Sequence, residues 1–217
     1  MTVRIDCADG RERPRAVTAA IAALRRGDLV ILPTENTYVL ATDPFSSRGT
    51  RALRAAKGQP DETPLGLVLP RAGTVPGIAA DVSASARTLM AAFWPGMLTL
   101  LLEPQPTLAW DHPAGSPIAL RVPAHPIALA VVSESGPTAA SGITDGGDPV
   151  RSCDHAMQVH PDAAIALDAG TLDARWSDIE DPELASTIVD VRGDTATILR
   201  HGAISEERIR AALAATT

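Results

Sequence analysis

The sequence predicts a mixed α/β fold of the α+β type, built from buried strands and amphipathic helices. Short continuous apolar runs, such as 29–32 and 65–69, are typical of strands that are buried on both faces. Amphipathic helical segments lie between these runs without regular alternation, which favours a mixed sheet over a purely parallel one. The 217 residues contain no repeat or linker, so we expect a single domain over 1–217.

The first part of the chain is expected to form a helix, a strand, a second strand and a second helix. In the helix at 14–26, Val17, Ile21 and Leu24 fall on one face, and Gly27 can adopt the left-handed conformation that ends it. The strand at 29–32 is interrupted by Pro33 and Thr34, and extended structure resumes at 38–40. The second helix is expected at 47–56, because glycine and proline at 58 and 60 end the helical pattern.

The rest of the chain continues the mixed pattern. Ser83 or Ser85 can cap a helix that runs through Phe93, and Ser205 opens the last helix. A further helix is expected at 126–133, and His125 is expected to order the turn before it. Strands are expected at 65–69, 97–102, 118–122, 138–141, 163–167, 187–191 and 195–199.

Composition excludes several classes of protein. Apolar residues at 45% and charged residues at 21% fit a soluble globular domain, and aromatic residues at 3% leave the core to Ala, Val, Ile and Leu. No apolar run approaches the roughly 18–20 residues of a membrane span, and the N-terminus does not resemble a signal peptide. Cys7 and Cys153 stand in no Cys/His pair, so we expect a cytoplasmic protein without a protein-built metal site.

The net charge of −7 argues against a protein that binds nucleic acid through bulk electrostatics. Arginines nevertheless gather around the first helix, at 11, 13, 15, 25 and 26. Most simply they form a solvated face, but a weak local contact with RNA stays open. The oligomeric state is not predicted.

Lys57 is the single lysine among the 19 Lys and Arg residues. A lysine that persists where almost every other cation is arginine indicates a position that requires a compact ammonium on a flexible stem. Such a group can follow phosphate or carboxylate oxygens, although a cation at a helix end is also explained by the helix dipole. Lys57 is therefore a candidate catalytic residue.

Three further segments have the composition of a ligand site. Hydroxyl and amide residues interrupt the chain at 33–38, directly after a buried strand, where ligands of open sheets tend to bind. Small and hydroxyl residues fill 138–147, so a ligand could approach the backbone there. Ser186 and Arg200 each lie at one end of a predicted strand, and the guanidinium could hold a phosphate or carboxylate.

The order of these motifs resembles that of the YrdC/Sua5 family, the threonylcarbamoyl-AMP synthases, in its short single-domain form. The resemblance spans about 14–212 and includes Pro33-Thr34, Tyr38, Lys57-Gly58-Gln59-Pro60 and Pro64-Leu65. It continues through Phe93-Trp94-Pro95-Gly96-Met97-Leu98-Thr99, Arg121-Val122-Pro123-Ala124-His125, Asp168-Ala169-Gly170, Ser186-Thr187-Ile188-Val189-Asp190 and Leu199-Arg200-His201-Gly202.

The resemblance implies a nucleotidyltransferase that condenses L-threonine, bicarbonate and ATP into threonylcarbamoyl-adenylate, releases pyrophosphate and supplies the t6A modification of tRNA. It implies a twisted mixed β-sheet with flanking helices and a concave ligand face. It also implies that Mg²⁺ accompanies ATP and bridges phosphate oxygens. Lys57 and Arg200 would neutralise charge on the leaving pyrophosphate. The residues that would bind substrate or nucleotide are Thr34, Asn36, Tyr38, Gln59, Thr99, Arg121, Ser141, Ile143 and Ser186.

The sequence departs from the family pattern at the site itself. Gln59 replaces an arginine and Ile143 an asparagine, so a charge and an amide are lost. Asn36, Thr37 and Val39 alter the first motif, and Asp145 places a carboxylate where phosphates are expected. Because each lost charged contact costs about 1.5–3 kcal/mol, these changes predict weakened ATP binding.

Two other interpretations therefore stay open. One is a diverged paralogue with a remodelled pocket that acts on another amino acid, carbamoyl donor or adenylate. The other is a non-catalytic module that binds nucleotide or RNA. The long acidic loop at 170–185 is expected to be a mobile surface loop or a lid over the site.

Overall fold

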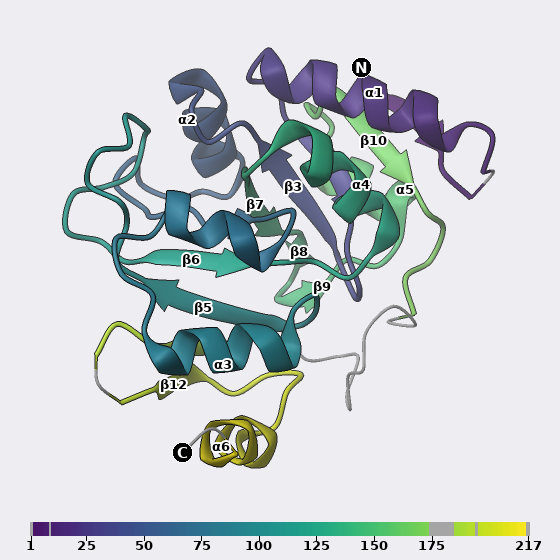
Figure 1. The fold of residues 1–217 in the computed structure, drawn as a ribbon. Helices are drawn as coiled ribbons and strands as arrows, with labels where there is room; N and C mark the ends of the chain where they lie inside the picture. Colours follow the sequence, from purple (N-terminus) through teal and green to yellow (C-terminus); the bar gives the residue numbers. More distant parts are fainter. Residues whose placement is uncertain (1, 9, 174–184, 194, 216–217) are drawn as a thin grey trace.

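The computed structural model describes residues 2–8, 10–173, 185–193 and 195–215. Within these residues, ten strands form one mixed sheet in the order β1-β10-β2-β3-β7-β4-β6-β5-β11-β12 (Figure 1). Neighbouring strands are parallel in four pairs, β1–β10, β10–β2, β4–β6 and β5–β11, and antiparallel in the rest. The predicted mixed α/β fold with flanking helices is confirmed.

The strands of the large sheet are β1 (Val3–Asp6), β2 (Val30–Pro33), β3 (Tyr38–Thr42), β4 (Leu67–Val68), β5 (Leu98–Leu102), β6 (Ile118–Arg121), β7 (Thr138–Gly142), β10 (Ile165–Asp168), β11 (Thr187–Asp190) and β12 (Thr197–Arg200). A small hairpin joins β8 (Thr144–Asp145) to β9 (Asp148–Pro149). The helices are α1 (Arg13–Arg25), α2 (Ser47–Ala56), η1 (Ala72–Gly77, a 3₁₀ helix), α3 (Ala84–Phe93), α4 (Pro126–Ser135), α5 (Cys153–Val159) and α6 (Glu206–Ala214).

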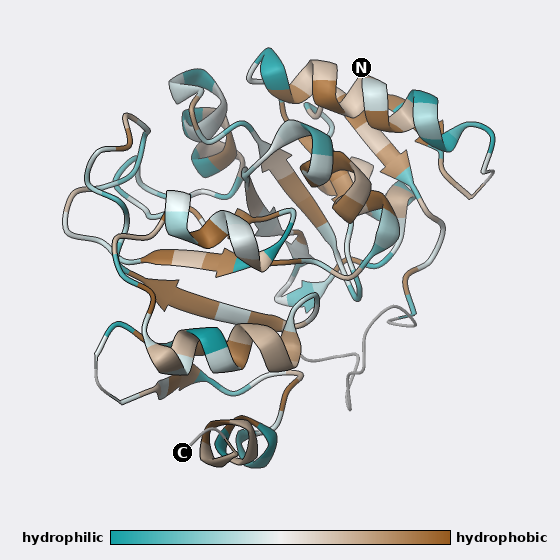
Figure 2. Ribbon diagram, viewed as in Figure 1, coloured by the Kyte–Doolittle hydropathy of each residue, from teal (hydrophilic) through white to brown (hydrophobic). Residues whose placement is uncertain are grey.

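The two faces of the sheet pack into different hydrophobic cores. A larger core joins one face to apolar side chains of α2, α3, α5 and α6, among them Leu53, Leu89, Ala156 and Ile209. A smaller core joins the other face of β2, β3 and β10 to α1 and α4. Figure 2 shows the apolar strands between helices whose outer surfaces are hydrophilic. Helices α1 and α4 cover only one end of their face, which leaves the other strands of that face for a site.

Most predicted elements agree with the structure to within one or two residues. Ser83, not Ser85, caps α3 by accepting a hydrogen bond from the Ala86 amide, and Ser205 caps α6 in the same way. Sequence reasoning missed β1, η1, α5 and the β8–β9 hairpin. These elements are short: α5 has seven residues and β8 and β9 have two each, so none repeats an apolar period long enough to be recognised.

A buried arginine fastens the long segment between β5 and β6 to helix α2. The Arg54 side chain is 1% exposed and donates to the Asp111 carboxylate at 2.8 Å and to the Thr63 carbonyl at 2.8 Å. Asp111 also accepts a hydrogen bond from Thr50. Sequence reasoning did not find this ion pair, because its two members are 57 residues apart.

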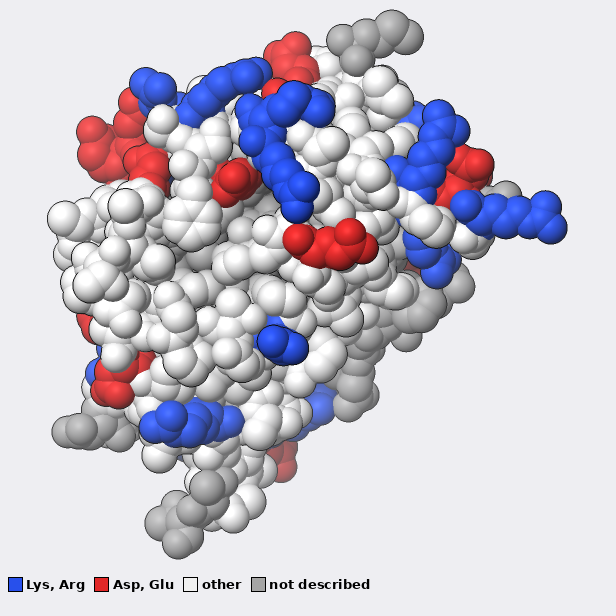
Figure 3. All heavy atoms as spheres, turned by 45° about the horizontal axis from the view of Figure 1, so that its top comes forward, with Lys and Arg blue, Asp and Glu red and all other residues white. Residues whose placement is uncertain are grey.

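Charges on the face that carries α1 are interspersed (Figure 3). Arg15 pairs with Glu12 at 3.3 Å and Arg26 with Asp28 at 2.9 Å, as expected of a solvated surface. The RNA contact raised by this arginine cluster stays a prediction. None of the described helices is both long enough and apolar enough to cross a bilayer.

His125 caps helix α4, as the sequence indicated for the turn before it. Its imidazole is buried, and Nδ1 accepts a hydrogen bond from the Ile127 amide at 3.3 Å. Burial lowers the pKa of His125 to about 4; the Glu35 charge opposes this shift and the Arg13 charge adds to it. The neutral imidazole is therefore the form that the folded protein favours.

The cap gives the protein a pH-dependent stability. In the unfolded chain the pKa of His125 is about 6.5. The contribution of neutral His125 to the free energy of unfolding is therefore fully present above pH 6.5 and is lost as the pH falls toward about 4. His125→Asn keeps an N-cap acceptor but cannot titrate. We expect the wild type to lose about 2–3 kcal/mol more than this variant between pH 7 and pH 4.5.

Urea unfolding at the two pH values measures this difference. His201→Asn is the control, because the His201 side chain is 72% exposed. Equal losses in the wild type and in His125→Asn would show that His125 does not contribute to the pH dependence.

Candidate functional site

A cavity of about 430 Å³ lies on the sheet face that α1 and α4 leave uncovered. Its lining includes strand residues whose neighbours in the sequence belong to the larger core, such as Thr99 between Leu98 and Leu100. The small residues Gly66, Ala119 and Ala140 leave part of its floor free of large side chains. The structure brings eight of the predicted site residues to this cavity: Thr34, Asn36, Thr99, Arg121, Ser141, Ile143, Ser186 and Arg200.

The interruption between β2 and β3 forms one wall of the cavity. Thr34 donates its hydroxyl to the Thr37 carbonyl at 2.6 Å, and its amide donates to the same oxygen at 3.0 Å. The Thr37 hydroxyl lies 3.1 Å from the Ile143 carbonyl and 3.0 Å from the Val150 carbonyl. The turn is thus fixed by its own hydroxyls and tied to the segment after β7, which forms the adjacent wall.

The opposite wall is a chain of hydroxyls that ends at a guanidinium. Thr99 Oγ1 and Ser186 Oγ are 2.8 Å apart, at the ends of the parallel strands β5 and β11. Arg200 donates to the Ser186 carbonyl from Nε at 3.0 Å and from Nη2 at 2.8 Å, and to Ser186 Oγ at 3.0 Å. Two predicted site hydroxyls and one predicted cation therefore form a single hydrogen-bonded group.

A second guanidinium, that of Arg121, is held by a carboxylate that sequence reasoning missed. Glu35 is fully buried; it pairs with Arg121 Nη2 and accepts a hydrogen bond from the Ala124 amide at 2.6 Å. Arg121 Nε donates to the Gly96 carbonyl at 2.9 Å. One feature of the sequence could have indicated Glu35 as a site residue: it is an acidic residue between Thr34 and Asn36, directly after an apolar strand.

The arrangement favours an anionic ligand. Partial burial lowers the pKa of Arg200, and the nearby positive charge of Arg121 lowers it further. An arginine stays protonated in spite of such a shift, so two cations face the same cavity. The cavity lining contains no Asp or Glu among its described residues. Phosphate and carboxylate oxygens accept hydrogen bonds from hydroxyl groups and from guanidinium groups, and this cavity offers hydroxyls together with two guanidinium groups.

Lys57 lies directly behind the cavity wall. It follows α2, and its Nζ donates to the Gly142 carbonyl at 2.7 Å, while Gly142 itself lines the cavity. Burial lowers the pKa of the Lys57 ammonium. Gln59 is not among the lining residues, and its side-chain Oε1 is buried without a described hydrogen-bond partner. The structure therefore places Lys57 next to the cavity and leaves Gln59 outside it.

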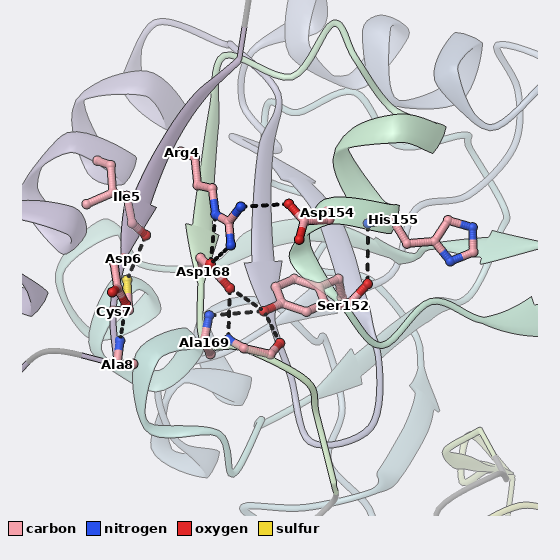
Figure 4. A network of polar contacts seen from close by, with 12 residues as sticks. Arg4, Ile5, Asp6, Cys7, Ala8, Ser152, Asp154, His155, Asp168 and Ala169 are labelled. Atoms are coloured by element: carbon pink, nitrogen blue, oxygen red, sulfur yellow. Dashed lines mark hydrogen bonds and ion pairs between the residues drawn. The ribbon is translucent and has the colours of Figure 1, made fainter.

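Tyr38 is not a cavity residue, contrary to the prediction. Its ring is fully buried in the larger core, and its hydroxyl donates to the Gly170 carbonyl at 2.8 Å and accepts from the Ala169 amide at 3.0 Å. The neighbouring Asp168 carboxylate accepts from the Gly170 amide at 2.8 Å and from Arg4 at 2.7 Å, and Figure 4 shows the Arg4 side chain directed at Asp168. Tyr38 therefore anchors the end of β10, because successive strand residues point to opposite faces and Val39, not Tyr38, faces the cavity.

Two of the departures from the family pattern do not present their side chains to the cavity. Asp145 does not line the cavity: its side chain is 62% exposed and lies 2.8 Å from the His155 ring. Ile143 borders the cavity, but its side chain is fully buried in the larger core. The weakened ATP binding expected from these departures stays a prediction.

The acidic loop predicted at 170–185 falls mainly outside the described residues, which omit 174–184. The described residues on the two sides of this gap contact different parts of the molecule. Leu172 donates to the Arg151 carbonyl at 2.9 Å, and Ala185 lines the cavity. The interpretation of this loop as a lid stays a prediction.

Comparison with known proteins gives consistent similarities. The family model Sua5_yciO_yrdC, described as "Telomere recombination", matches residues 22–202. A Mycobacterium tuberculosis (strain ATCC 25618 / H37Rv) protein named "Putative threonylcarbamoyl-AMP synthase" is 36% identical over 212 residues, which cover 96% of this chain and 94% of that protein. The threonylcarbamoyl-AMP synthase of Bacillus subtilis (strain 168) is 32% identical over 91% of this chain and 56% of its own.

Solved structures share the fold. P. abyssi Sua5 complexed with L-threonine superposes with a TM-score of 0.83 at 25% identity, over 98% of this chain and 61% of that chain. This chain therefore spans about three-fifths of the P. abyssi protein. E. coli YciO superposes with a TM-score of 0.79 over 96% of this chain and 98% of its own, and at 18% identity it supports the fold alone.

The buried pair of Glu35 and Arg121 gives a direct test of the site geometry. Glu35→Gln keeps an acceptor for the Ala124 amide but leaves the Arg121 cation without its counter-charge. Because breaking a buried ion pair is costly, we expect a loss of about 3 kcal/mol in the free energy of unfolding, measured in urea. Glu12→Gln, which breaks the exposed pair with Arg15, is the control and should cost less than about 1 kcal/mol. Equal losses in the two variants would contradict the role assigned to the buried pair.

Proposed function

The chain belongs to the Sua5–YciO–YrdC family, and from that membership we propose that it condenses L-threonine, bicarbonate and ATP into threonylcarbamoyl-adenylate and pyrophosphate. The observation that carries the proposal is the convergence of Thr34, Thr99, Ser186, Arg121 and Arg200 on one cavity. Its volume of about 430 Å³ lies in the range of about 300–1,000 Å³ that is usual for small-molecule sites.

In the proposed reaction, the threonine amine and bicarbonate form a carbamate with loss of water, and a carbamate oxygen attacks the α-phosphorus of ATP. The bond between the α-phosphorus and the bridging oxygen breaks, and pyrophosphate leaves with that oxygen. Negative charge therefore accumulates on the leaving group. Arg200 and Lys57 are the cations that we assign to its stabilisation, with Arg121 as a further binding cation. The contribution of the protein is fixed positive charge and orientation, without a covalent intermediate.

Lys57 can serve this role from its observed position. Its ammonium contacts the Gly142 carbonyl at the cavity wall, and a flexible four-carbon stem lets the charge move toward a phosphate oxygen. Partial burial makes the exchange of a carbonyl for an anionic oxygen favourable, because an ammonium removed from water gains more from an opposite charge.

Mg²⁺ fits this cavity only as a partner of the nucleotide. No group of three or more His, Cys, Asp or Glu residues gathers in the described part of the chain, and the Glu35 carboxylate is occupied by Arg121 and Ala124. Phosphate oxygens and water would hold the ion, which would supply charge neutralisation when bound.

The product would supply the t6A modification of tRNA in the cytoplasm.

A diverged paralogue with a remodelled pocket is the alternative, because a neutral Gln59 stands where the family pattern has an arginine. An enzyme of that kind would keep the adenylate-forming chemistry and accept another amino acid or carbamoyl donor.

Pyrophosphate release by the purified protein tests the proposal. With ATP, Mg²⁺ and bicarbonate, we expect release that depends on L-threonine and exceeds release with other amino acids, and mass spectrometry should identify threonylcarbamoyl-adenylate. Arg200→Ala should lower kcat/KM by about 10- to 100-fold, the loss of one charged contact. Arg210→Ala, which removes an exposed arginine on α6, is the control and should leave the rate unchanged. Release that requires a different amino acid would establish the remodelled pocket instead.

Lys57→Ala should abolish pyrophosphate release, since no other lysine exists in the chain to substitute for it. Lys57→Arg should restore little activity, because a planar guanidinium cannot occupy the place of a compact ammonium behind the cavity wall. Thermal denaturation would establish that both variants are folded. Full activity in folded Lys57→Ala would remove Lys57 from the mechanism.

A further inference from the structure

Two chain segments cross closely at the wall of the cavity that Arg200 forms. The first is 185–187, which leads into β11, and the second is 200–204, which begins at the last residue of the edge strand β12. The Ala203 amide donates to the Ala185 carbonyl at 2.9 Å. Ala185 and Ser186 line the cavity, so this crossing sets one of its boundaries.

A buried threonine locks the crossing from one side. Thr187 is fully buried; its hydroxyl donates to the Ile204 carbonyl at 2.7 Å and accepts from the Ile204 amide at 2.9 Å. Both hydrogen-bonding groups of the Ile204 backbone are thus satisfied by one side chain. The Thr187 amide in turn donates to Met97 at 3.0 Å, which joins the crossing to the start of β5.

A glycine permits the close approach on the other side. A Cβ atom added to Gly202 would lie 2.3 Å from the Ala185 carbonyl oxygen and 2.7 Å from the Thr187 backbone nitrogen. Both atoms belong to the backbone, so the clash could be relieved only by moving one segment away from the other. The requirement for glycine is therefore steric.

The Arg200 guanidinium depends on this crossing for its position. Within the described part of the chain, it is held by three hydrogen bonds, all of them to Ser186. Ser186 lies between Ala185 and Thr187, the two residues that the second segment contacts. A displacement of 200–204 would therefore move Arg200 away from Ser186 and relative to the rest of the cavity.

We propose that Gly202 and Thr187 are positioning residues, which set the place of the Arg200 guanidinium through the crossing and contact no ligand themselves. The proposal rests on the assignment of Arg200 to the phosphate-binding cavity. Neither residue appears among those that line the cavity. The structure thus gives a function at the site to a glycine and a buried threonine that sequence motifs leave without a role.

A double-mutant cycle tests this dependence. Gly202→Ala should lower kcat/KM for ATP, followed by pyrophosphate release, by about 10- to 100-fold, as expected when one charged contact is misplaced. In an Arg200→Ala background the same substitution should change kcat/KM less than about twofold, because its effect passes through Arg200. Gly193→Ala is the matched control, since a Cβ atom there meets nothing within 4 Å. Equal effects of Gly202→Ala in the two backgrounds, or none in the wild type, would overturn the proposal.

A second pair of variants decides the question if Gly202→Ala does not fold. Thr187→Ser keeps the hydroxyl that holds Ile204 and should retain activity, whereas Thr187→Val removes it and should lose activity as Gly202→Ala does. Calorimetric binding of inorganic pyrophosphate is measured on the same proteins and depends on no amino-acid substrate. Weakened pyrophosphate binding in Thr187→Val but not in Thr187→Ser supports positioning even if the wild type does not use threonine. A wild type that binds pyrophosphate but releases none with threonine refutes the proposed reaction alone, whereas equal binding by both Thr187 variants refutes the positioning role.

Discussion

The buried carboxylate of Glu35 joins the two halves of the cavity. It comes from the turn between β2 and β3, and it holds the Arg121 side chain at the end of β6 and the Ala124 amide beyond it. These strands are not neighbours: β7 and β4 lie between β3 and β6 in the sheet. A fully buried carboxylate is tolerated because a guanidinium and an amide compensate its charge. The position of one cavity cation and the shape of the adjacent turn therefore depend on the same ion pair.

The cavity exists because helices cover the two faces of the sheet unequally. Helices α2, α3, α5 and α6 and the 3₁₀ helix η1 pack against one face, while α1 and α4 cover only the β2, β3 and β10 end of the other. Strands on the uncovered part present alternate residues, so small and hydroxyl side chains line the cavity while their neighbours complete the larger core. The two arginines are then held in different ways, Arg121 by a carboxylate and Arg200 by the carbonyl and hydroxyl of Ser186. Among the described residues, Arg121 therefore has a paired carboxylate and Arg200 does not.

The departures from the family pattern have unequal consequences once their positions are known. Asp145 pairs with His155 away from the cavity, and the Ile143 side chain completes the core. The replacement of arginine by Gln59 still removes a charge, and Gln59 carries one of two buried side-chain atoms without a partner among the described residues. The cavity lining thus contains neither Asp145 nor Gln59. Gln59 follows Lys57 by two residues in the chain.

The sequence by itself determined the fold class, most of the longer helices and strands, and eight residues that meet at the cavity. Apolar periodicity and capping residues are local properties, and hydroxyl and arginine residues at strand ends indicate a ligand site wherever the strands meet. The tertiary structure alone decided which side chains face that site. It turned Tyr38 toward Asp168 and Gly170, paired Glu35 with Arg121 across 86 residues of sequence, and packed Gly202 against Ala185. These outcomes follow from strand register and from contacts between distant segments, which no local pattern of residues encodes.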